Sequence, residues 1–407
     1  MNHFRHLLLA TLAALTTAPL YAQADFQKAL QTQFVLAEAG DVIDIPAGNY
    51  TLTKSLWLDQ GQNVTIRGAG IGQTVLSFAE QTEGAEGIKV TGGQRILIEE
   101  LTVQDAKGDA IKTQDVDGIT FRNVRTAWTG KPKKTNGAYG LYPVLCQNVL
   151  IEGCESEGAS DAGIYVGQSK NIIVRNCTAH HNVTGIEIEN SQRADVYDNL
   201  THDNTGGILV FDLPNLVQKK GGHVRIFNNE LRENNLKNFA PKGNIVAGVP
   251  PGTGILILAT SDVEVFGNRI IDHRTTGTAI MSYYMTEQPI NDAAYDPYPK
   301  RIFIHDNHYE RKPMRATAQT RLGKLYRFKL KFGRNVPHIV YDGILPEKAR
   351  DANGQVKEEY QICVRNNTNA SFAQLDAEGD FKNISRDLAP YDCARPSLEA
   401  TELALDK

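Results

Sequence analysis

The stretch NIIVRNCTAHHNVTGIEIEN (Asn171–Asn190) decides the fold. Apolar and polar residues alternate within it in short runs, and Asn or Gly separates one run from the next. The preceding stretch, NVLIEGCESEGASDAGIYVG (Asn148–Gly167), has the same order of residue types. A repeat of short strands indicates that each unit buries its apolar face by stacking on its neighbours.

Two columns of apolar residues continue this repeat through the middle of the chain. The first column consists of pairs two residues apart: Ile96/Ile98, Ile119/Phe121, Val149/Ile151, Ile172/Val174, Ala194/Val196, Val224/Ile226, Val263/Val265 and Ile302/Ile304. The second column follows a Gly or Ala step: Ile88, Ile111, Leu141, Ile164, Ile186, Ile208, Ile255 and Ile280. The most frequent interval in the second column is 22 to 23 residues, and loops account for the excess.

The length and composition of one repeat predict the architecture. Each unit holds strands of period two and no helical period. Coils of three short strands, stacked at the ~4.8 Å spacing of paired strands, satisfy these features. A propeller blade needs roughly 40 to 45 residues, and a leucine-rich repeat shows a Leu and Asn framework. We therefore predict an all-β, right-handed parallel β-helix over residues 25–310.

The corner between two strands recurs at one position of each coil. The corner residues are Leu101, Val124, Cys154, Cys177, Asn199, Asn229, Asn268 and Asn307. Asn tolerates left-handed backbone, and its amide can pair with the Asn of the next coil, so the later corners predict a structural asparagine ladder. We interpret Cys154 and Cys177 as small apolar corner residues rather than a disulfide.

The two ends of the stack need caps, because open coils expose strand edges. Residues 25–41 predict an amphipathic helix that closes the bottom. Residues 311–407 form a C-terminal extension in which 361–372 predict at least one late coil. The basic stretch 321–334 interrupts this extension, as a solvated cationic loop or as a polyanion site. Cys363 and Cys393 lie close in sequence and could form a disulfide in an oxidising compartment. The alternative is that both stay free thiols, and both alternatives remain open.

The first 24 residues predict export. Arg5 precedes an apolar run from Leu7 to Leu15, and Ala22-Gln23-Ala24 has the small-residue pattern of a cleavage site, so the mature chain is expected to begin near Asp25. No later run reaches the ~18 apolar residues of a membrane span. We expect a periplasmic or secreted protein. Loss of Arg5 changes the balance from 43 basic against 47 acidic residues to 42 against 47, which disfavours nucleic acid as a partner.

Alternation places a line of functional side chains on one outward face. Lys112, Tyr142, Tyr165 and Glu187 occupy equivalent positions in successive coils, and Glu189 stands beside Glu187. Phenols and carboxylates on a flat face suit a sugar chain. Tyr142 and Tyr165 are candidate acid/base groups, and Lys112 is a candidate for neutralising a substrate carboxylate. No cofactor is required by this pattern, although Glu187 and Glu189 could hold Ca²⁺.

Three excursions, residues 127–138, 212–222 and 283–300, are predicted to wall this face. Asp212, Tyr283 and Tyr284 in the last two are candidate substrate-binding residues.

His180 and His202 occupy equivalent positions in neighbouring coils, followed by His181 and Asp203. We list His180 and His202 as candidate substrate contacts. A metal or proton-transfer role is the alternative, and simple tolerance of His at a polar turn is the simplest interpretation. No metal-ligand spacing motif accompanies them, so no dedicated metal site is predicted.

The chain resembles right-handed β-helix proteins that bind or cleave carbohydrates, over about residues 40–307. The run Tyr139-Gly140-Leu141-Tyr142-Pro143-Val144 is similar to the catalytic region of mannuronan C5-epimerases. Those enzymes carry Asp-Pro-His where this chain has Tyr142, Pro143 and Val144, and valine cannot accept a proton. The phrases GIEIENS, GGILVFDLP and GTGILILA also resemble a subgroup of exported bacterial β-helix proteins encoded beside a c-type cytochrome-like protein, which implies a periplasmic partner.

Two functions follow as hypotheses. The first is a polysaccharide-binding protein with lyase or epimerase activity on uronates. The second is a non-catalytic binding or assembly module of the periplasm that uses the same face. Turnover of a uronate polymer, detected by absorbance near 235 nm or by NMR, distinguishes them.

Overall fold

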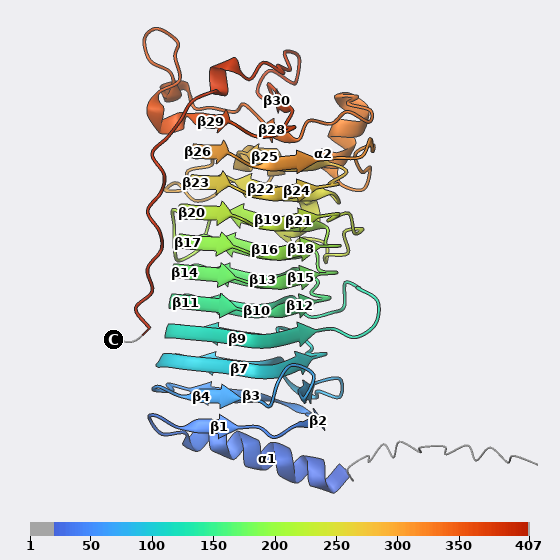
Figure 1. The fold of residues 1–407 in the computed structure, drawn as a ribbon, viewed down its shortest axis with the longest axis vertical. Coiled ribbons are helices and arrows are strands. Elements are labelled where there is room, and N and C mark those ends of the chain that lie inside the picture. Colours follow the sequence, from blue (N-terminus) through green and yellow to red (C-terminus); the bar gives the residue numbers. More distant parts are fainter. Residues whose placement is uncertain (1–19, 406–407) are drawn as a thin grey trace, which may run out of the picture.

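Parallel strands wind into a stack of coils in the computed structural model, which describes residues 20–405 and their side chains from residue 25 onward (Figure 1). The predicted signal segment lies largely outside the described residues. No helix within residues 20–405 has the length and apolarity needed to cross a bilayer. The prediction of a right-handed parallel β-helix is confirmed, since every named strand pairs in parallel with strands of the adjacent coils.

An 11-stranded sheet, here the B sheet, forms one side of every coil. Its strands are β3 (Lys54–Asp59), β6 (Glu83–Thr91), β8 (Ile111–Gln114), β10 (Tyr139–Val144), β13 (Ala162–Gly167), β16 (Thr184–Glu189), β19 (Gly206–Phe211), β22 (Thr253–Leu258), β25 (Thr276–Met281), β28 (Ile339–Tyr341) and β30 (Phe372–Gln374). The last two strands continue the stack beyond residue 311.

A 19-stranded sheet, here the A sheet, forms the other two sides as two ladders. The first ladder contains β1 (Val42–Asp44), β4 (Thr65–Arg67), β11 (Gln147–Glu152), β14 (Lys170–Arg175), β17 (Gln192–Tyr197), β20 (Gly222–Phe227), β23 (Ser261–Phe266), β26 (Lys300–His305) and β29 (Ile362–Arg365). The second contains β2 (Gly48–Thr51), β5 (Thr74–Ser77), β12 (Glu155–Glu157), β15 (Thr178–His180), β18 (Leu200–His202), β21 (Glu230–Arg232), β24 (Arg269–Ile271) and β27 (His308–Glu310). The long strands β7 (Gln94–Gln104) and β9 (Asp117–Ala127) bend through both ladders.

The apolar columns predicted from the repeat form the interior. Ile164 pairs with Ile186, Ile186 pairs with Ile208, and all three are fully buried. The predicted place of Ile280 in the second column is wrong. Ile255 pairs with Thr278, and the predicted Ile280 pairs with Ile257 instead. The buried Thr278 hydroxyl shares a hydrogen bond of 2.8 Å with the Tyr309 hydroxyl, which satisfies a polar group in an apolar column.

The Gly step before each interior aliphatic residue is required by the neighbouring coil. A Cβ atom on Gly185 would lie 2.7 Å from the Gly207 carbonyl oxygen, and one on Gly207 would lie 2.6 Å from that of Gly254. Since real Cβ atoms do not approach backbone this closely, the coils can stack here only because these side chains are absent.

The predicted asparagine ladder is present. Asn199, Asn229, Asn268 and Asn307 each donate from Nδ2 to the next Asn Oδ1 at 2.9 to 3.0 Å, and Asn307 donates in turn to Asn367. A second ladder, which the sequence analysis missed, links Asn182, Asn204 and Asn234 at the next corner. Cys154 and Cys177 are buried free thiols, as interpreted.

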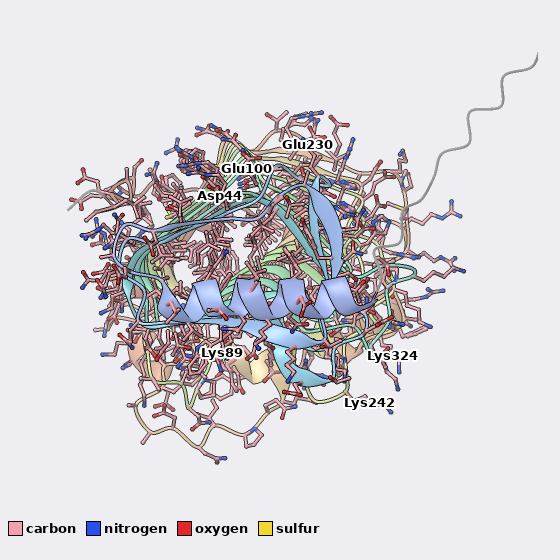
Figure 2. The ribbon with its side chains drawn as sticks, turned by 90° about the horizontal axis from the view of Figure 1, so that it is seen from below. Asp44, Lys89, Glu100, Glu230, Lys242 and Lys324 are labelled. Carbon is pink, nitrogen blue, oxygen red and sulfur yellow. A yellow bond between two sulfur atoms is a disulfide. The ribbon has the colours of Figure 1, made fainter. Side chains whose placement is uncertain are left out.

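Helix α1 (Leu20–Leu36) closes the lower end of the stack (Figures 1 and 2). Leu30 and Phe34 insert into the core, which confirms the predicted capping helix at residues 25–36. At the upper end, Cys363 and Cys393 form a disulfide. Residues beyond it descend along the outside of the first A ladder, where Thr401 donates to Asp195 and Ala404 donates to Asn148.

Helices over the upper coils cover the outer face of the B sheet. They are η1 (Ile245–Gly248), η2 (Tyr283–Thr286), α2 (Arg321–Lys324) and the π-helical turn η3 (Leu325–Lys329). Tyr326 is buried against this face together with Val249 and Leu256. The basic stretch 321–334 is therefore not a simple solvated loop, since its apolar residues complete a second core. A polyanion site on its exposed cationic side chains stays a prediction.

Candidate functional site

The line of side chains predicted on the outer B face is in register. Lys112 pairs with Tyr142, and Tyr165 pairs with Glu187. The Tyr142 and Tyr165 rings lie 5.0 Å apart between centroids. Extending the line downward adds Lys89, which pairs with Lys112, and Trp57, which pairs with Lys89. The prediction that these positions share one face is confirmed.

This outward face is open to solvent only in its lower part. Trp57 is 47 % exposed, and Lys89, Lys112 and Tyr142 are half-buried, whereas Glu187 is only 1 % exposed. Tyr165 and Glu189 are also buried. The cause is an excursion between β21 and β22 that the sequence analysis overlooked within the long interval between Ile208 and Ile255.

The excursion is held against the face by specific contacts. Asn244 donates to Asp161 Oδ2 at 2.9 Å. Val249 lies so near Gly206 that a Cβ atom there would be 3.3 Å from Val249 Cγ1. Asn238 donates from Nδ2 to the carbonyl oxygens of Val246 and Val249 at 2.9 Å. These bonds order the segment, which shields the carboxyl groups beneath from water.

Three tyrosines and three acidic residues meet beneath this excursion. We call this set the acid–tyrosine cluster: Tyr139, Tyr142, Tyr165, Asp161, Glu187 and Glu189. The Tyr139 ring lies 4.5 Å from Tyr142 and 4.4 Å from Tyr165. Tyr165 donates its hydroxyl proton to Glu189 Oε1 at 2.6 Å. Asp161 and Tyr139 were not among the predicted site residues, although Asp161 directly precedes β13 and Tyr139 begins β10.

Gly167 makes the Tyr165–Glu189 bond possible. It pairs with Glu189 in the next coil, so the Tyr165 ring must cross its backbone to reach that carboxylate. A Cβ atom on Gly167 would lie 2.3 Å from Tyr165 Cε1. The close approach of the ring therefore requires glycine.

Burial shifts the proton equilibria of the cluster. Desolvation raises the pKa of Asp161 to about 7, against a weaker opposing effect of the Asn244 hydrogen bond. It likewise raises the pKa of Glu189 to about 7, although the Tyr165 hydrogen bond opposes the shift. The pKa of Glu187 lies well above its ordinary range, from burial and then from the nearby Asp161 and Glu189 charges. Such groups hold and exchange protons near neutral pH.

Asp109 lies at the accessible edge of the cluster and was also missed. It is half-buried, and desolvation raises its pKa to about 6, while the Lys112 charge lowers it. The Lys112 ammonium stands 5.0 Å from the centroid of the Tyr142 ring. Burial and then the Asp109 charge raise the pKa of Tyr142 to about 12, so its hydroxyl keeps its proton at neutral pH. A carboxylate, a phenol and an ammonium thus meet where the face opens.

Ca²⁺ binding by Glu187 and Glu189 stays a prediction. It would require both carboxyl groups to ionise inside a buried cluster, where Oε1 of Glu189 already accepts the Tyr165 proton. Oε2 of Glu187 has no hydrogen-bond partner among the described residues, which accords with a neutral acid.

The other predicted substrate contacts lie away from the cluster. Asp212 is buried and accepts from the Gly221 backbone N–H at 3.0 Å, so it stabilises its own excursion. Tyr283 is buried beside Tyr295, and Tyr284 is 46 % exposed. Tyr283 lines a cavity of about 750 Å³ between the excursions, floored by Leu256, Leu258 and Met281.

His180 and His202 belong to the second A ladder, not to the B sheet. They pair in register, and their rings stack at 5.1 Å. Nδ1 of His202 bonds Asp203 at 2.8 Å, whereas Nδ1 of His180 bonds His181.

A groove of about 970 Å³ runs from the cap helix to the lower B strands. Its walls include Lys54, Trp57 and Lys89 from the B sheet and Val35 from α1. Seen from below, Lys89 lies on the side of the molecule opposite Asp44, Glu100 and Glu230 (Figure 2). The groove thus offers the Trp57 ring and the Lys89 ammonium, which lead toward Lys112, whereas Lys54 is paired with Glu83 at 2.9 Å.

Known proteins share this architecture. The family described as right handed beta helix region matches residues 55–216. The pre-neck appendage protein of Bacillus phage B103 is 22 % identical over 209 residues, which span 42 % of this chain and only 24 % of that protein.

Among solved structures, the mannuronan C-5 epimerase AlgE4 A-module of Azotobacter vinelandii superposes with a TM-score of 0.54 at 15 % identity, covering 85 % of this chain and 90 % of that one. An alginate lyase from Paenibacillus sp. str. FPU-7 gives 0.45 at 14 % identity, covering 70 % and 96 %. Identities this low show a shared fold and nothing finer. The stacked parallel coils thus give this chain the right-handed parallel β-helix fold.

Proposed function

We propose that this protein is exported and binds an acidic, uronate-containing polysaccharide along the lower part of the outer B face. The observation that carries the proposal is the column Trp57, Lys89, Lys112 and Tyr142, which is open to solvent and ends at the acid–tyrosine cluster. An aromatic ring stacks on sugars, and ammonium groups about one strand spacing apart match a polymer with regularly spaced carboxylates.

Export is supported by two features. The first 24 residues have the pattern of a signal peptide. Cys363 and Cys393 are bridged, which suits an oxidising compartment such as the periplasm or the extracellular space. A periplasmic cytochrome-like partner, implied only by the sequence resemblance, stays a prediction.

We further propose β-elimination at the opening of the cluster. Asp109, with a pKa of about 6, removes the proton on C5 of a uronate whose carboxylate is paired with Lys112. The electrons of the C5–H bond form the C4–C5 double bond, and the bond from C4 to the glycosidic oxygen breaks. The Tyr142 hydroxyl, protonated at neutral pH, gives its proton to the leaving oxygen. Return of a proton to the opposite face of C5 would give epimerisation instead.

The chemistry of the known epimerase-like motif does not transfer directly, since Val144 stands where a basic His would be. Asp109 supplies a base from the preceding coil. Its half-burial explains how it can have a pKa near working pH while remaining accessible to substrate.

Non-catalytic binding is the second candidate. The burial of Glu187 and Tyr165, together with the Tyr165–Glu189 bond, favours a structural role for the inner cluster. In that case Lys89, Lys112 and Trp57 bind the polymer, and no bond is broken.

The test combines binding and turnover with alginate, pectate and the neutral polymer dextran. We expect affinity for one of the first two, weakened by salt, and none for dextran. Lys112→Met should weaken binding about tenfold. Asp109→Asn should leave binding intact and lower the appearance of 235 nm absorbance, or of epimerised residues by NMR, by roughly 10² to 10⁴-fold.

Lys324→Met is the matched control, because Lys324 is an exposed cation of the upper coils outside the column. It should change neither binding nor turnover. Binding without turnover in the wild type leaves the binding module as the function. Equal binding by the Lys112 and Lys324 variants would contradict the proposed face.

A further inference from the structure

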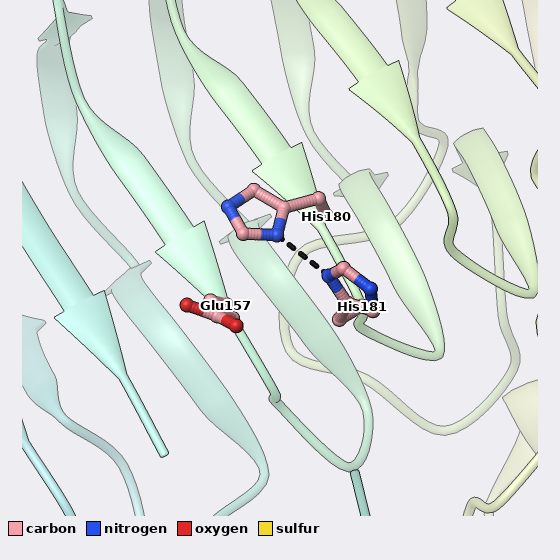
Figure 3. Close-up of side chains that lie close together, drawn as sticks. All are labelled: Glu157, His180 and His181. Atoms are coloured by element: carbon pink, nitrogen blue, oxygen red, sulfur yellow. Dashed lines mark hydrogen bonds between the residues drawn. The ribbon is translucent and has the colours of Figure 1, made fainter. Parts of the chain in front are cut away.

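Glu157, His180 and His181 bring three metal-ligating atoms together on the second A ladder (Figure 3). Glu157 ends β12, His180 ends β15, and these two residues pair in register. One ligand atom from each residue lies within 4.8 Å of those of the other two. The group is separate from the outer B face and has no part in the function proposed above.

The backbone at His181 creates the pair of imidazoles. Its φ of 57° is in the left-handed region, as at the equivalent corner residues Asp203, Glu233 and Asp272 of the following coils. This conformation turns the chain at the end of β15, so that two consecutive rings face each other instead of pointing to opposite sides. Their Nδ1 atoms are 2.8 Å apart (Figure 3).

Neighbouring residues orient His180 as they orient metal-binding histidines elsewhere. Its Nε2 lies 3.4 Å from Glu155 Oε1, and the His202 ring stacks on it at 5.1 Å with an angle of 11°. A carboxylate on one ring nitrogen fixes the proton there and leaves the lone pair on the other nitrogen, here Nδ1. The lone pair is thereby directed toward His181.

We propose that Glu157, His180 and His181 bind a transition-metal cation, with Zn²⁺ as the best fit. Two imidazole nitrogens and one carboxylate oxygen form a ligand set that Zn²⁺ favours over the hard cations Ca²⁺ and Mg²⁺. The cation enters between the two Nδ1 atoms, and the proton that His181 Nδ1 donates there moves to Nε2 of the same ring. All three side chains are half-buried, so water completes the coordination.

The ligand distances require a small closure on binding. Two ligands at the ~2.0 to 2.2 Å bond lengths of Zn²⁺ stand closer together than 4.8 Å. The Glu157 side chain rotates toward the metal, and the two Nδ1 atoms, 2.8 Å apart, separate slightly. One of its oxygens, Oε2, accepts from Arg125 Nη2 at 2.7 Å, and Arg125 also holds Glu155. Arg125 therefore holds the carboxylates of Glu155 and Glu157 in place, and Oε1 of Glu157 is still available to the metal.

The experiment is a titration of the full, chelator-treated protein with Zn²⁺ by isothermal calorimetry. One ion should bind at this site. His181→Ala removes a ligand and should weaken binding by more than about 100-fold, and Glu155→Gln should weaken it about 10 to 100-fold.

His308→Ala is the matched control. His308 is a more exposed imidazole on the same ladder whose Nε2 bonds Glu310 at 2.7 Å, and within residues 25–405 its ring contacts no second imidazole. The His308→Ala variant should bind Zn²⁺ as tightly as the wild type does. Glu155→Gln removes no ligand and no apolar contact, so its effect can be measured even if the His181 variant folds poorly. Absence of Zn²⁺ binding by the wild type, or equal binding by the Glu155 and His308 variants, would overturn the proposal.

Discussion

The lower and upper parts of the outer B face differ in solvent exposure, although both consist of the same kind of parallel strand. Trp57, Lys89 and Lys112 occupy the lower end of one register column, and Leu209 and Leu256 occupy its upper part. The lower residues reach solvent, whereas Leu209 is fully buried under excursions. In a β-helix, an outward position is therefore exposed only where no inserted segment folds back over it.

The acid–tyrosine cluster lies at the boundary between these parts. The polar residues of the lower part of the face lie directly below it, and the excursions that exclude water cover the coils above it. Carboxyl groups at such a boundary keep access to protons while losing hydration, which explains why their pKa values rise toward neutrality.

The largest expected effect comes from placing a charge at each end of the column. Leu209→Asp puts a carboxylate into the second core and should lower the free energy of unfolding by about 4 kcal/mol or more. Trp57→Asp, at the open end, should lower it by about 1 kcal/mol or less. Urea denaturation followed by circular dichroism measures both. Similar losses for the two variants would refute the contrast between the parts.

The pH dependence of stability tests the boundary itself. The pKa of Glu189 is about 7 in the folded protein, against an ordinary value of 4.5. Below pH 4.5 both states hold the proton, so the stabilisation is complete, and it is lost as pH rises to 7 because only the folded state retains the proton. At about 1.4 kcal/mol per pKa unit, the loss is roughly 3 kcal/mol.

Glu189→Gln should remove this decline. The informative quantity is the difference in free energy of unfolding between wild type and variant at pH 4.5 and at pH 7.5, since other groups titrate equally in both proteins. A difference that is the same at the two pH values would mean that Glu189 is ionised in the folded protein.

A smaller effect is expected for Gly167→Ala, which tests how the cluster is packed. The new methyl group collides with the Tyr165 ring and should displace it from Glu189, at a cost of about 2 kcal/mol. Gly130→Ala is a control in a loop with open space around it, although its positive φ makes a loss of about 1 kcal/mol expected there too. The decisive measurement is NMR of the Tyr165 hydroxyl environment, which Gly167→Ala alone should change.

Repetition made most of the fold predictable. The interior columns, the asparagine corners and the cap helix follow from alternation and from the interval between coils, since stacked coils bring equivalent positions together. The same logic placed Lys112, Tyr142, Tyr165 and Glu187 in one line, as the registers show. Extending that column downward in the sequence would also have found Trp57 and Lys89.

Tertiary structure decided what no repeat encodes. The segment that covers Glu187, the contact of Asn244 with Asp161 and the nearness of Asp109 to Tyr142 depend on how irregular excursions and turns return to the stack. The contact between Nδ1 of His180 and Nδ1 of His181 depends on the side-chain rotamers at one corner. Periodic strands are specified by local alternation and hydrogen bonding, whereas burial and proton affinity are set by whichever distant side chains exclude water from a group.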